Sequence, residues 1–246
     1  MYPHKFIPKS PYVAISVTVG KATYSMASGG SVIGIKYDGG VLIASDTLLS
    51  YGSLAKWPNI PRIKILGSSS AVCASGDYAD FQEVTKILES RINEDAIAGD
   101  APEMDSWELF STLHRFMYQK RCDFEPAVCQ FVFAGSNAEG KTILAGVDDI
   151  GTKWEADCVG SGYGAHISIP LLRKVLDAKN NKITRDEALA VVQDCLRVTF
   201  YRECRAINKF QIADISAGKV VISDPFSLET KWDFAGFAFE KTAIIR

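Results

Sequence analysis

A glycine-rich segment before an expected helix is the first candidate for chemistry. Residues Gly160–Gly164 read Gly-Ser-Gly-Tyr-Gly, and backbone N–H groups at the start of a helix can hold a phosphate. The segment lacks the lysine and the full spacing of a P-loop. We therefore interpret it as a tight connection between a strand and a helix.

Two acidic residues and one histidine are further candidates. Asp148 and Asp149 could divide the roles of general acid and general base, but they adjoin the Ile150-Gly151 turn and are more typical of solvated turn residues. His166 could act as a base, yet the sequence identifies no serine or cysteine as its nucleophilic partner. We interpret His166 as a surface or interface residue.

The chain has six cysteines, and none of them forms a Cys-x-x-Cys pair. Most lie in apolar segments, which predicts buried free thiols and a reducing compartment. Neither His114 nor His166 stands at a ligand spacing from a cysteine, so we expect no metal site, and no motif implies a cofactor. The cysteines are Cys73, Cys122, Cys129, Cys158, Cys195 and Cys204.

The overall composition excludes several classes of protein. Of the 246 residues, 47% are apolar and 23% are charged, which is typical of a globular protein with a substantial core. The 27 basic and 29 acidic residues give a net charge of −2 and no general attraction to nucleic acid or to anionic membranes. No apolar run approaches the roughly 20 residues that a membrane-spanning helix needs. We therefore expect a soluble protein without nucleic acid or membrane partners.

The expected elements alternate between blocks of strands and pairs of helices. Asp38-Gly39-Gly40 joins two β-branched runs and predicts a hairpin. After Gly76 the apolar spacing changes to three and four residues, which predicts a helix capped by Asp77. Thr184 and Glu187 have the spacing of a capping box. Strands are expected at 31–37, 41–46, 62–66, 71–75, 127–134, 142–147, 153–159, 210–216 and 220–223, and helices at 78–92, 104–122, 167–178 and 184–204.

This order of elements excludes a parallel doubly wound sheet, because consecutive hairpins leave no crossover between neighbouring strands. It predicts one α+β domain in which two antiparallel sheets lie between two pairs of helices, a four-layer αββα sandwich. Sheets in such a sandwich are covered on both faces, which explains why the strands are apolar on both sides. No linker or repeat divides the chain.

Two segments and this order of layers carry a resemblance to a known family. Gly40–Asp46 and the turn Ala74–Asp77 resemble proteasome β-type subunits, which have the N-terminal-nucleophile hydrolase fold. The resemblance covers nearly the whole chain after residue 29. Further segments are similar to the beta-seven position of the eukaryotic ring, also called beta type-4: Ser50–Ala55, Ser75–Gln82, Pro170–Arg173, Tyr201-Arg202 with Phe210–Ala213, and Glu229–Asp233.

The resemblance implies three regions and a missing nucleophile. Residues 1–29 are expected to be a leader or propeptide-like segment, 30–223 the β-type domain, and 224–246 an arm for contacts between subunits. In active members, cleavage after a glycine exposes a threonine whose hydroxyl attacks the peptide carbonyl. Here the threonine position falls on Gly30 and the preceding glycine on Gly29, so the hydroxyl is absent.

The other positions of the family's site are altered unevenly. Asp46 matches the family aspartate, and the family lysine falls on Arg62, which keeps the charge but releases no proton at ordinary pH. Ser161 matches the family serine, whereas the later aspartate and serine fall on Glu203 and Ala206. We expect Asp46 and Ser161 to be structural, closing turns and bonding to the backbone. None of these residues is predicted to be catalytic.

The resemblance implies a non-catalytic structural subunit of the 20S proteasome core, in the cytoplasm and the nucleus. Its expected partners are subunits of the α-ring and the β-ring, including neighbours in the same β-ring and beta-one and beta-two of the opposite ring, with unfolded polypeptide in the chamber. One alternative is an active peptidase processed to begin at Thr23, Ser25, Ser28 or Ser31. Another is a free-standing binding protein on the same scaffold.

Two regions are expected to present apolar side chains to partners. Tyr51, Leu54 and Trp57 are expected in a long loop before Pro58. Region 224–246 carries large apolar residues whose spacing fits neither a strand nor a helix, so we expect it not to bury itself on its own domain. The resemblance implies that this arm inserts between beta-one and beta-two of the opposite ring, and a short final strand with a frayed end is the alternative. Its large apolar residues are Phe226, Leu228, Trp232, Phe234, Phe237 and Phe239.

Overall fold

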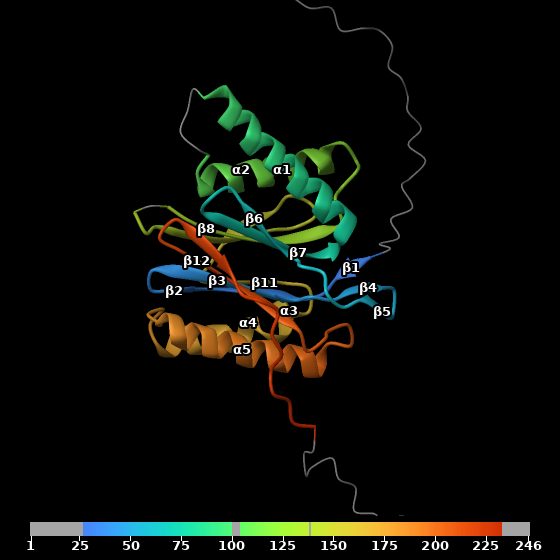
Figure 1. Cartoon of the computed structure of the whole chain (residues 1–246), viewed down its shortest axis with the longest axis vertical. Helices are drawn as coiled ribbons and strands as arrows, with labels where there is room; N and C mark the ends of the chain where they lie inside the picture. The colour runs from blue at the N-terminus through green and yellow to red at the C-terminus, as the bar shows by residue number, and fades with distance from the viewer. Residues whose placement is uncertain (1–26, 100–103, 138, 233–246) are drawn as a thin grey trace, which may run out of the picture.

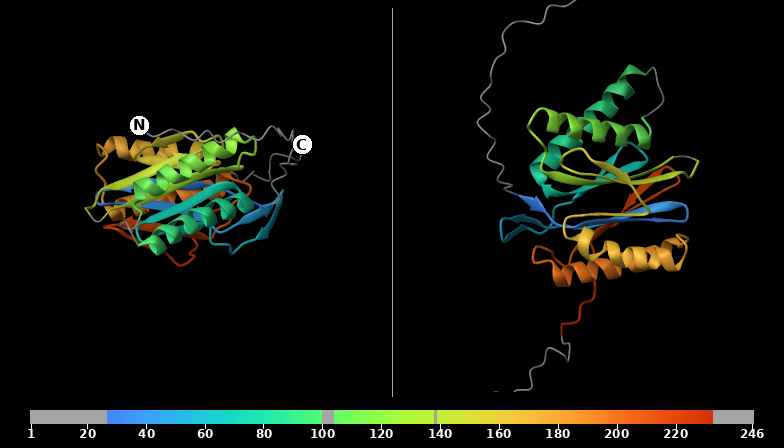
Figure 2. Two further views of the ribbon diagram at one scale, coloured as in Figure 1. Left: turned by 90° about the horizontal axis from the view of Figure 1, so that it is seen from above. Right: turned by 180° about the vertical axis from the view of Figure 1, so that it is seen from behind.

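The computed structural model describes residues 27–99, 104–137 and 139–232, which form four layers (Figure 1). Two helices cover one sheet, a second sheet lies against the first, and further helices cover the outer face of the second sheet. The view from behind in Figure 2 shows the same succession of layers. The predicted αββα sandwich is therefore confirmed.

The first sheet has eight strands, and every pairing in it is antiparallel. Its strand order is β10-β9-β8-β7-β1-β4-β5, and β6 pairs with β7 beside this path. The strands are β1 (Ser28–Gly29), β4 (Leu49–Tyr51), β5 (Leu54–Trp57), β6 (Ile63–Leu66), β7 (Ser70–Asp77), β8 (Cys129–Ser136), β9 (Thr142–Val147) and β10 (Lys153–Glu155). The last two residues of the expected leader, Ser28 and Gly29, thus belong to the sheet.

The second sheet has five antiparallel strands in the order β11-β2-β3-β12-β13. The predicted hairpin joins its central strands, and Gly39 supplies the left-handed conformation in the turn with φ of 92°. Strand β12 pairs along the whole of β3, from Phe210 opposite Asp46 to Ser216 opposite Gly40. The strands are β2 (Val32–Tyr37), β3 (Gly40–Asp46), β11 (Cys158–Ser161), β12 (Phe210–Ser216) and β13 (Lys219–Ile222).

Three of the five described helices begin at side-chain caps, and the sequence predicts two of these caps. The Asp77 side chain accepts a hydrogen bond from the N–H of Ala79, and Thr184 forms the expected capping box with Glu187. A second capping box, of Asp105 and Glu108, starts the helix after residue 105. The helices are α1 (Tyr78–Ala98), α2 (Ser106–Cys122), α3 (Gly164–Ile167), α4 (Ile169–Ala178) and α5 (Arg185–Arg202).

The buried side chains form three apolar layers, one between each pair of structural layers. Along β8, Phe131 and Phe133 face α1 and α2, whereas Val132 and Ala134 face the second sheet. Strand β3 alternates in the same way between the sheet interface and the layer under α4 and α5. Both strands are therefore covered on both faces, which explains their uninterrupted apolar sequences.

One expected strand is divided between the two sheets. Residues 153–159 are predicted as a single strand, but β10 pairs with β9 in the first sheet and β11 pairs with β2 in the second. The crossing lies between Ala156, whose N–H bonds to Leu144 O at 3.2 Å, and Asp157, whose carbonyl accepts from Lys36 N at 2.8 Å. The prediction of one strand is wrong because neighbouring peptide groups bond to different sheets.

The expected loop before Pro58 is a hairpin. Strands β4 and β5 pair antiparallel and turn at Gly52, which has φ of 60°. The prediction of a loop is therefore wrong. The sequence does not reveal these strands, because residues 51–56 are all exposed and show no alternation of apolar and polar residues. Tyr51 and Leu54 are exposed as expected, with 42% and 59% of their surfaces accessible, whereas Trp57 is half-buried.

All six cysteines are free thiols, but Cys122 and Cys204 are exposed, so the prediction of burial is wrong for these two. Cys122 is the last residue of α2 and Cys204 lies two residues after α5, and at the end of a helix an apolar neighbourhood in sequence does not imply a covered position. Within the described residues, no helix is both long enough and apolar enough to cross a bilayer.

The segment after β13 packs on its own domain as far as Trp232. Phe226 exchanges two backbone hydrogen bonds with Phe210, and the Asn208 side chain bonds to both the N–H and the carbonyl of Leu228. The Trp232 ring meets the Tyr201 ring edge-on at 4.9 Å. The expectation that region 224–246 does not bury itself on its own domain is therefore wrong for Phe226 and Leu228, which are half-buried, whereas Trp232 remains 63% exposed. The remaining residues, 233–246, lie outside the described part of the chain.

Candidate functional site around Gly30

Gly30 connects β1 of the first sheet to β2 of the second and lies against the segment that follows α5. A β-carbon built on Gly30 would lie 3.0 Å from Glu203 Oε1 and 3.5 Å from the Arg205 carbonyl oxygen. A side chain at residue 30 would therefore press on the Glu203 carboxylate. As the sequence stands, residue 30 offers no hydroxyl to this site.

Arg62 holds three parts of the site together. Its side chain is 1% exposed, and its Nη1 lies 2.5 Å from Asp46 Oδ1 at the end of β3. Its Nη2 donates to the Gly30 carbonyl oxygen at 2.6 Å and to the Ala74 carbonyl oxygen, on β7, at 2.9 Å. Its Nε has no hydrogen-bond partner among the described atoms. The guanidinium thus joins both sheets to the connection between them.

Asp46 is buried, and its carboxylate accepts from the Ile207 N–H at 3.4 Å as well as from Arg62. Burial raises the pKa of Asp46 to about 6, and the nearby Glu203 adds to the rise, against the attraction of Arg62. The carboxylate therefore remains ionised at neutral pH and serves as the counter-charge of Arg62. The expected backbone contact of Asp46 is present.

Ser31 fixes the orientation of Glu203. Its hydroxyl donates to Glu203 Oε2 at 2.5 Å and accepts from the Gly164 N–H at 2.7 Å. The sequence suggested Ser31 only as an alternative first residue, and its position directly after Gly30 was the available signal. In the structure, Ser31 links the end of α5 to the start of α3.

The two remaining family positions, Ala206 and Ser161, differ in their surroundings. Ala206 lines a narrow gap of about 10 Å³ together with Ser31, Asp46 and Glu203, so the structure places three of the six family positions next to one another. Ser161 is 3% exposed, but its Oγ has no hydrogen-bond partner among the described residues. The expectation that the Ser161 hydroxyl bonds to the backbone is wrong, because only its main chain takes part in the pairing with Val32.

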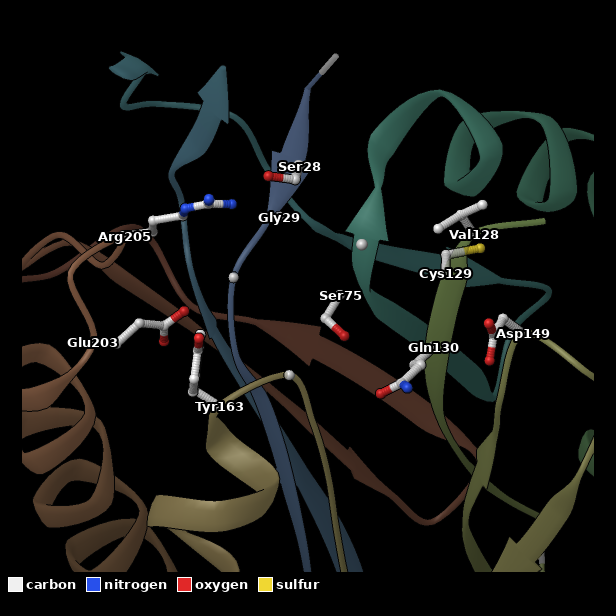
Figure 3. Close-up of a pocket in the computed structure, with 13 residues that line it drawn as sticks. Ser28, Gly29, Ser75, Val128, Cys129, Gln130, Asp149, Tyr163, Glu203 and Arg205 are labelled. Atoms are coloured by element: carbon white, nitrogen blue, oxygen red, sulfur yellow. The ribbon is translucent and has the colours of Figure 1, made fainter. Parts of the chain in front are cut away.

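A cavity of about 310 Å³ opens beside Gly30 (Figure 3). Ser75 and Gln130, from β7 and β8, point toward its centre, with Glu203 and Tyr163 on one side and Asp149 on the other. The full lining is Ser28, Gly29, Gly30, Ser75, Gly76, Val128, Cys129, Gln130, Asp149, Gly162, Tyr163, Glu203 and Arg205.

The thiol nearest to this cavity is unsuited to attack. Cys129 lines the cavity but is 1% exposed, and burial raises the pKa of its thiol well above the ordinary value. Because the thiolate is the reactive form, a thiol held protonated at neutral pH is a weak nucleophile. The cavity therefore has polar groups for contact with a chain segment but presents no activated sulfur.

The other candidates from the sequence have structural roles. Asp148 Oδ1 accepts hydrogen bonds from the N–H groups of Ile150 and Thr152, at 3.1 and 2.6 Å, so this residue closes a turn as predicted. Gly160–Gly164 spans the end of β11 and the start of α3, which confirms a tight connection between strand and helix. His166 is exposed on α3, as predicted. Among the described residues, no group of three or more His, Cys, Asp or Glu side chains is placed to hold a metal ion.

Comparison with known proteins gives a match over most of the chain. Residues 26–215 match the family model described as "Proteasome subunit". The chain belongs to the proteasome subunit family. Proteasome subunit beta type-4 of Xenopus laevis is 37% identical over 210 residues, covering 85% of this chain and 86% of that protein.

Two further relatives show the same relationship. Proteasome subunit beta type-4 of Dictyostelium discoideum is 40% identical over 205 residues, covering 83% of this chain and 78% of the relative. Proteasome subunit beta type-7 of Saccharomyces cerevisiae is 34% identical over 220 residues, covering 85% and 82%. The resemblance to the proteasome β-type family is therefore confirmed, and the family match includes β1, Gly30 and Arg62.

Proposed function

We propose that this chain is a non-catalytic, structural subunit of the β-ring of the 20S proteasome core. The observation that carries the proposal is Gly30, which stands at the family's nucleophile position and has no hydroxyl. A threonine-type peptidase requires that hydroxyl for attack on the peptide carbonyl. The chain thus contributes to a complex that degrades proteins to peptides without cutting peptides itself.

The contacts of Gly30 support this proposal. Its carbonyl oxygen is held by Arg62 Nη2 at 2.6 Å, and Gly29 before it is paired with both β4 and β7. A free amino group at residue 30, which an active member needs as its proton acceptor, would require the chain to be cut directly after this paired strand. Arg62 also replaces a group able to release a proton by one that holds it at all ordinary pH values.

The relatives named beta type-4 and beta type-7 support the proposal that the chain assembles with other proteasome subunits. We infer partners in the α-ring and on both sides in the β-ring, and we propose beta-one and beta-two of the opposite ring as the partners of the C-terminal arm, residues 224–246. Unfolded polypeptide in the chamber is the material that the whole particle processes. A particle of this kind places the chain in the cytoplasm and the nucleus.

A single preparation tests the proposed function. Native mass spectrometry of the particle purified through a tag on this chain should give a stoichiometry of two copies per double ring, by the two-fold relation of its rings. An epoxyketone probe applied to the same preparation should label active subunits and leave this chain unlabelled. Labelling of this chain, or its recovery as a free monomer, would contradict the proposal.

A further inference from the structure

The narrow gap beside Ala206 lies between the end of α5 and the strands β2, β3 and β12. Seven of the eight residues that line it are buried, and Ala206 is half-buried. Four of the lining residues have oxygen atoms in their side chains, and the other four are apolar. The first four are Ser31, Asp46, Thr199 and Glu203, and the others are Ile33, Leu196, Ala206 and Phe210.

This gap is distinct from the larger cavity beside Gly30. Among the described residues, Glu203 is the one that lines both. The volume of the gap, about 10 Å³, is that of a single water molecule, because a bound water needs about 10–15 Å³ of accessible space and two to four polar partners. The gap is therefore too small for a larger ligand, and its four oxygen-bearing side chains can supply the partners of a water.

Two carboxylates face this gap, and both lack a shared donor. Asp46 pairs with Arg62, whereas Glu203 accepts from the Ser31 hydroxyl at 2.5 Å. Burial and, to a smaller extent, the proximity of Glu203 raise the pKa of Asp46 to about 6, so the two carboxylates repel each other. The Ser31 proton is already used on Glu203, and the Thr199 hydroxyl donates to the Cys195 carbonyl at 2.9 Å.

We propose that one buried water molecule is bound in this gap and donates a hydrogen bond to each of the carboxylates of Asp46 and Glu203. A water has two O–H groups and can serve both acceptors at once. It joins the Arg62–Asp46 pair to the Ser31–Glu203 pair, and the resulting network connects the two sheets with the end of α5. This inference goes beyond the proposed function and does not depend on it, because the gap is formed within a single chain.

A structure of the full-length chain that resolves ordered water tests this site. We expect one density peak in the gap, with contacts of about 2.5–3.0 Å to an oxygen of Asp46 and to an oxygen of Glu203, as in O–H···O hydrogen bonds. Direct contact between the two carboxylates without a peak would mean that they share a proton, and it would overturn the proposal. A peak with several oxygen neighbours at about 2.0–2.5 Å would be a cation, which would also overturn it.

The substitution Ala206→Ser provides a second test, because it brings a hydroxyl to the edge of the gap. The serine oxygen should replace the water, so the peak disappears and the new hydroxyl bonds to Asp46 or Glu203. Ala71→Ser is the matched control, since Ala71 is 0% exposed in the apolar layer between the sheets and is paired with Ala134. There the same change buries a hydroxyl among apolar side chains.

Thermal unfolding of the two serine variants gives the readout that needs no density. Ala206→Ser should have a melting temperature within about 2 °C of wild type, whereas Ala71→Ser should melt on the order of 5 °C lower, because its hydroxyl gains no partner. An equal loss in the two variants would show that the gap accepts no oxygen atom, and the water site would be wrong. Persistence of the peak in Ala206→Ser, with the serine hydroxyl turned away, would leave the water in place and support the site.

Discussion

Arg62 Nη1 lies 2.5 Å from Asp46 Oδ1 in a place where both side chains are almost fully buried. The same guanidinium holds the carbonyl oxygens of Gly30 and Ala74. A buried ion pair contributes little net stability relative to an apolar pair, but the loss of one partner leaves the other charge buried and unpaired. The residues of the altered site therefore matter for folding even where they do no chemistry.

Loss of the Arg62 charge should destabilise the chain strongly. Arg62→Met leaves the Asp46 carboxylate buried without its partner, and we expect the free energy of unfolding to fall by about 3–5 kcal/mol. Chemical denaturation of the purified chains measures this change. The double variant Arg62→Met/Asp46→Leu should be more stable than Arg62→Met alone, because it leaves no unpaired charge. A double variant that is less stable than the single one would count against this account.

The two neighbouring glycines should respond differently to a methyl group. A β-carbon on Gly29 would lie 2.6 Å from Arg62 Nε, whereas the nearest atom to one on Gly30 is the Glu203 carboxylate oxygen at 3.0 Å. Gly29→Ala must displace a buried guanidinium and should cost about 1–3 kcal/mol of unfolding free energy. Gly30→Ala needs only a small shift of a carboxylate and should cost less. Thermal unfolding of both variants measures these losses of stability. Equal losses would show that the Arg62 side chain moves aside without a free-energy cost.

The raised pKa of Asp46 predicts a pH dependence of stability. Burial raises this pKa from 3.8 to about 6 in the folded chain, so the folded chain binds the proton more tightly than the unfolded chain between these values. The contribution of Asp46 is therefore fully present below about pH 4 and is lost as the pH rises through 6. The difference in stability between wild type and Asp46→Asn should change by on the order of 2–3 kcal/mol over this range.

Denaturation curves of wild type and Asp46→Asn between pH 4 and pH 8 provide the measurement. The difference between the two proteins isolates Asp46, because the other carboxylates titrate in both. We expect the difference to level off above pH 7. A difference that stays flat from pH 4 to pH 7, or that changes with the opposite sign, would show that Arg62 outweighs burial.

Restoring the missing hydroxyl should not create a peptidase. Gly30→Thr supplies the hydroxyl, but Arg62, Glu203 and Ala206 still differ from the active pattern, and the new β-carbon presses on Glu203 Oε1 at 3.0 Å. Particles with this variant should show no epoxyketone labelling at residue 30. Mass spectrometry of the labelled chain gives the readout, with an active subunit of the same particle as positive control. Labelling at residue 30 would contradict this prediction.

Truncation after Trp232 should separate folding from assembly. Residues up to Trp232 contact α5 and Asn208, so removal of 233–246 keeps the contacts of Arg197 with Glu229, of Tyr201 with Lys231, and of Asn208 with Leu228. We expect unfolding free energy within about 0.5 kcal/mol of wild type and slower joining of half-particles. A longer deletion from Leu228 should also lower stability, which serves as the control. Normal joining of particles that carry the shorter deletion would contradict the proposed cross-ring contact.

The layers of the fold could be predicted because their signals are local. Asp77 and the pair Thr184 and Glu187 stand at the caps where the structure places them, and the hairpin turn at Gly39 joins β2 to β3. The hairpin β4–β5 and the crossing at Ala156-Asp157 escaped prediction, because the pairing of exposed strands and the choice of sheet depend on distant partners.

The candidate site could be predicted in part, because several of its residues lie in short family motifs. Alignment with family motifs identifies Gly30, Asp46 and Arg62 by their order in the chain, and the structure brings them together. The role of Ser31 depends on Glu203, which lies far away in sequence, and no local pattern indicates that contact. Strand β1 escaped prediction because two residues carry no periodicity.

The pairing of β12 with β3 also constrains how the protein folds. The two strands lie near opposite ends of the chain, and their pairing places β12 at the side of β3 away from β2. During synthesis, β3 therefore emerges long before its partner exists, and one edge of the β2–β3 hairpin stays unpaired until the ribosome has added β12, which follows α5. Such non-local pairing slows folding and leaves an aggregation-prone edge exposed in the meantime. Nascent chains should consequently need protection until the last fifth of the sequence has been translated.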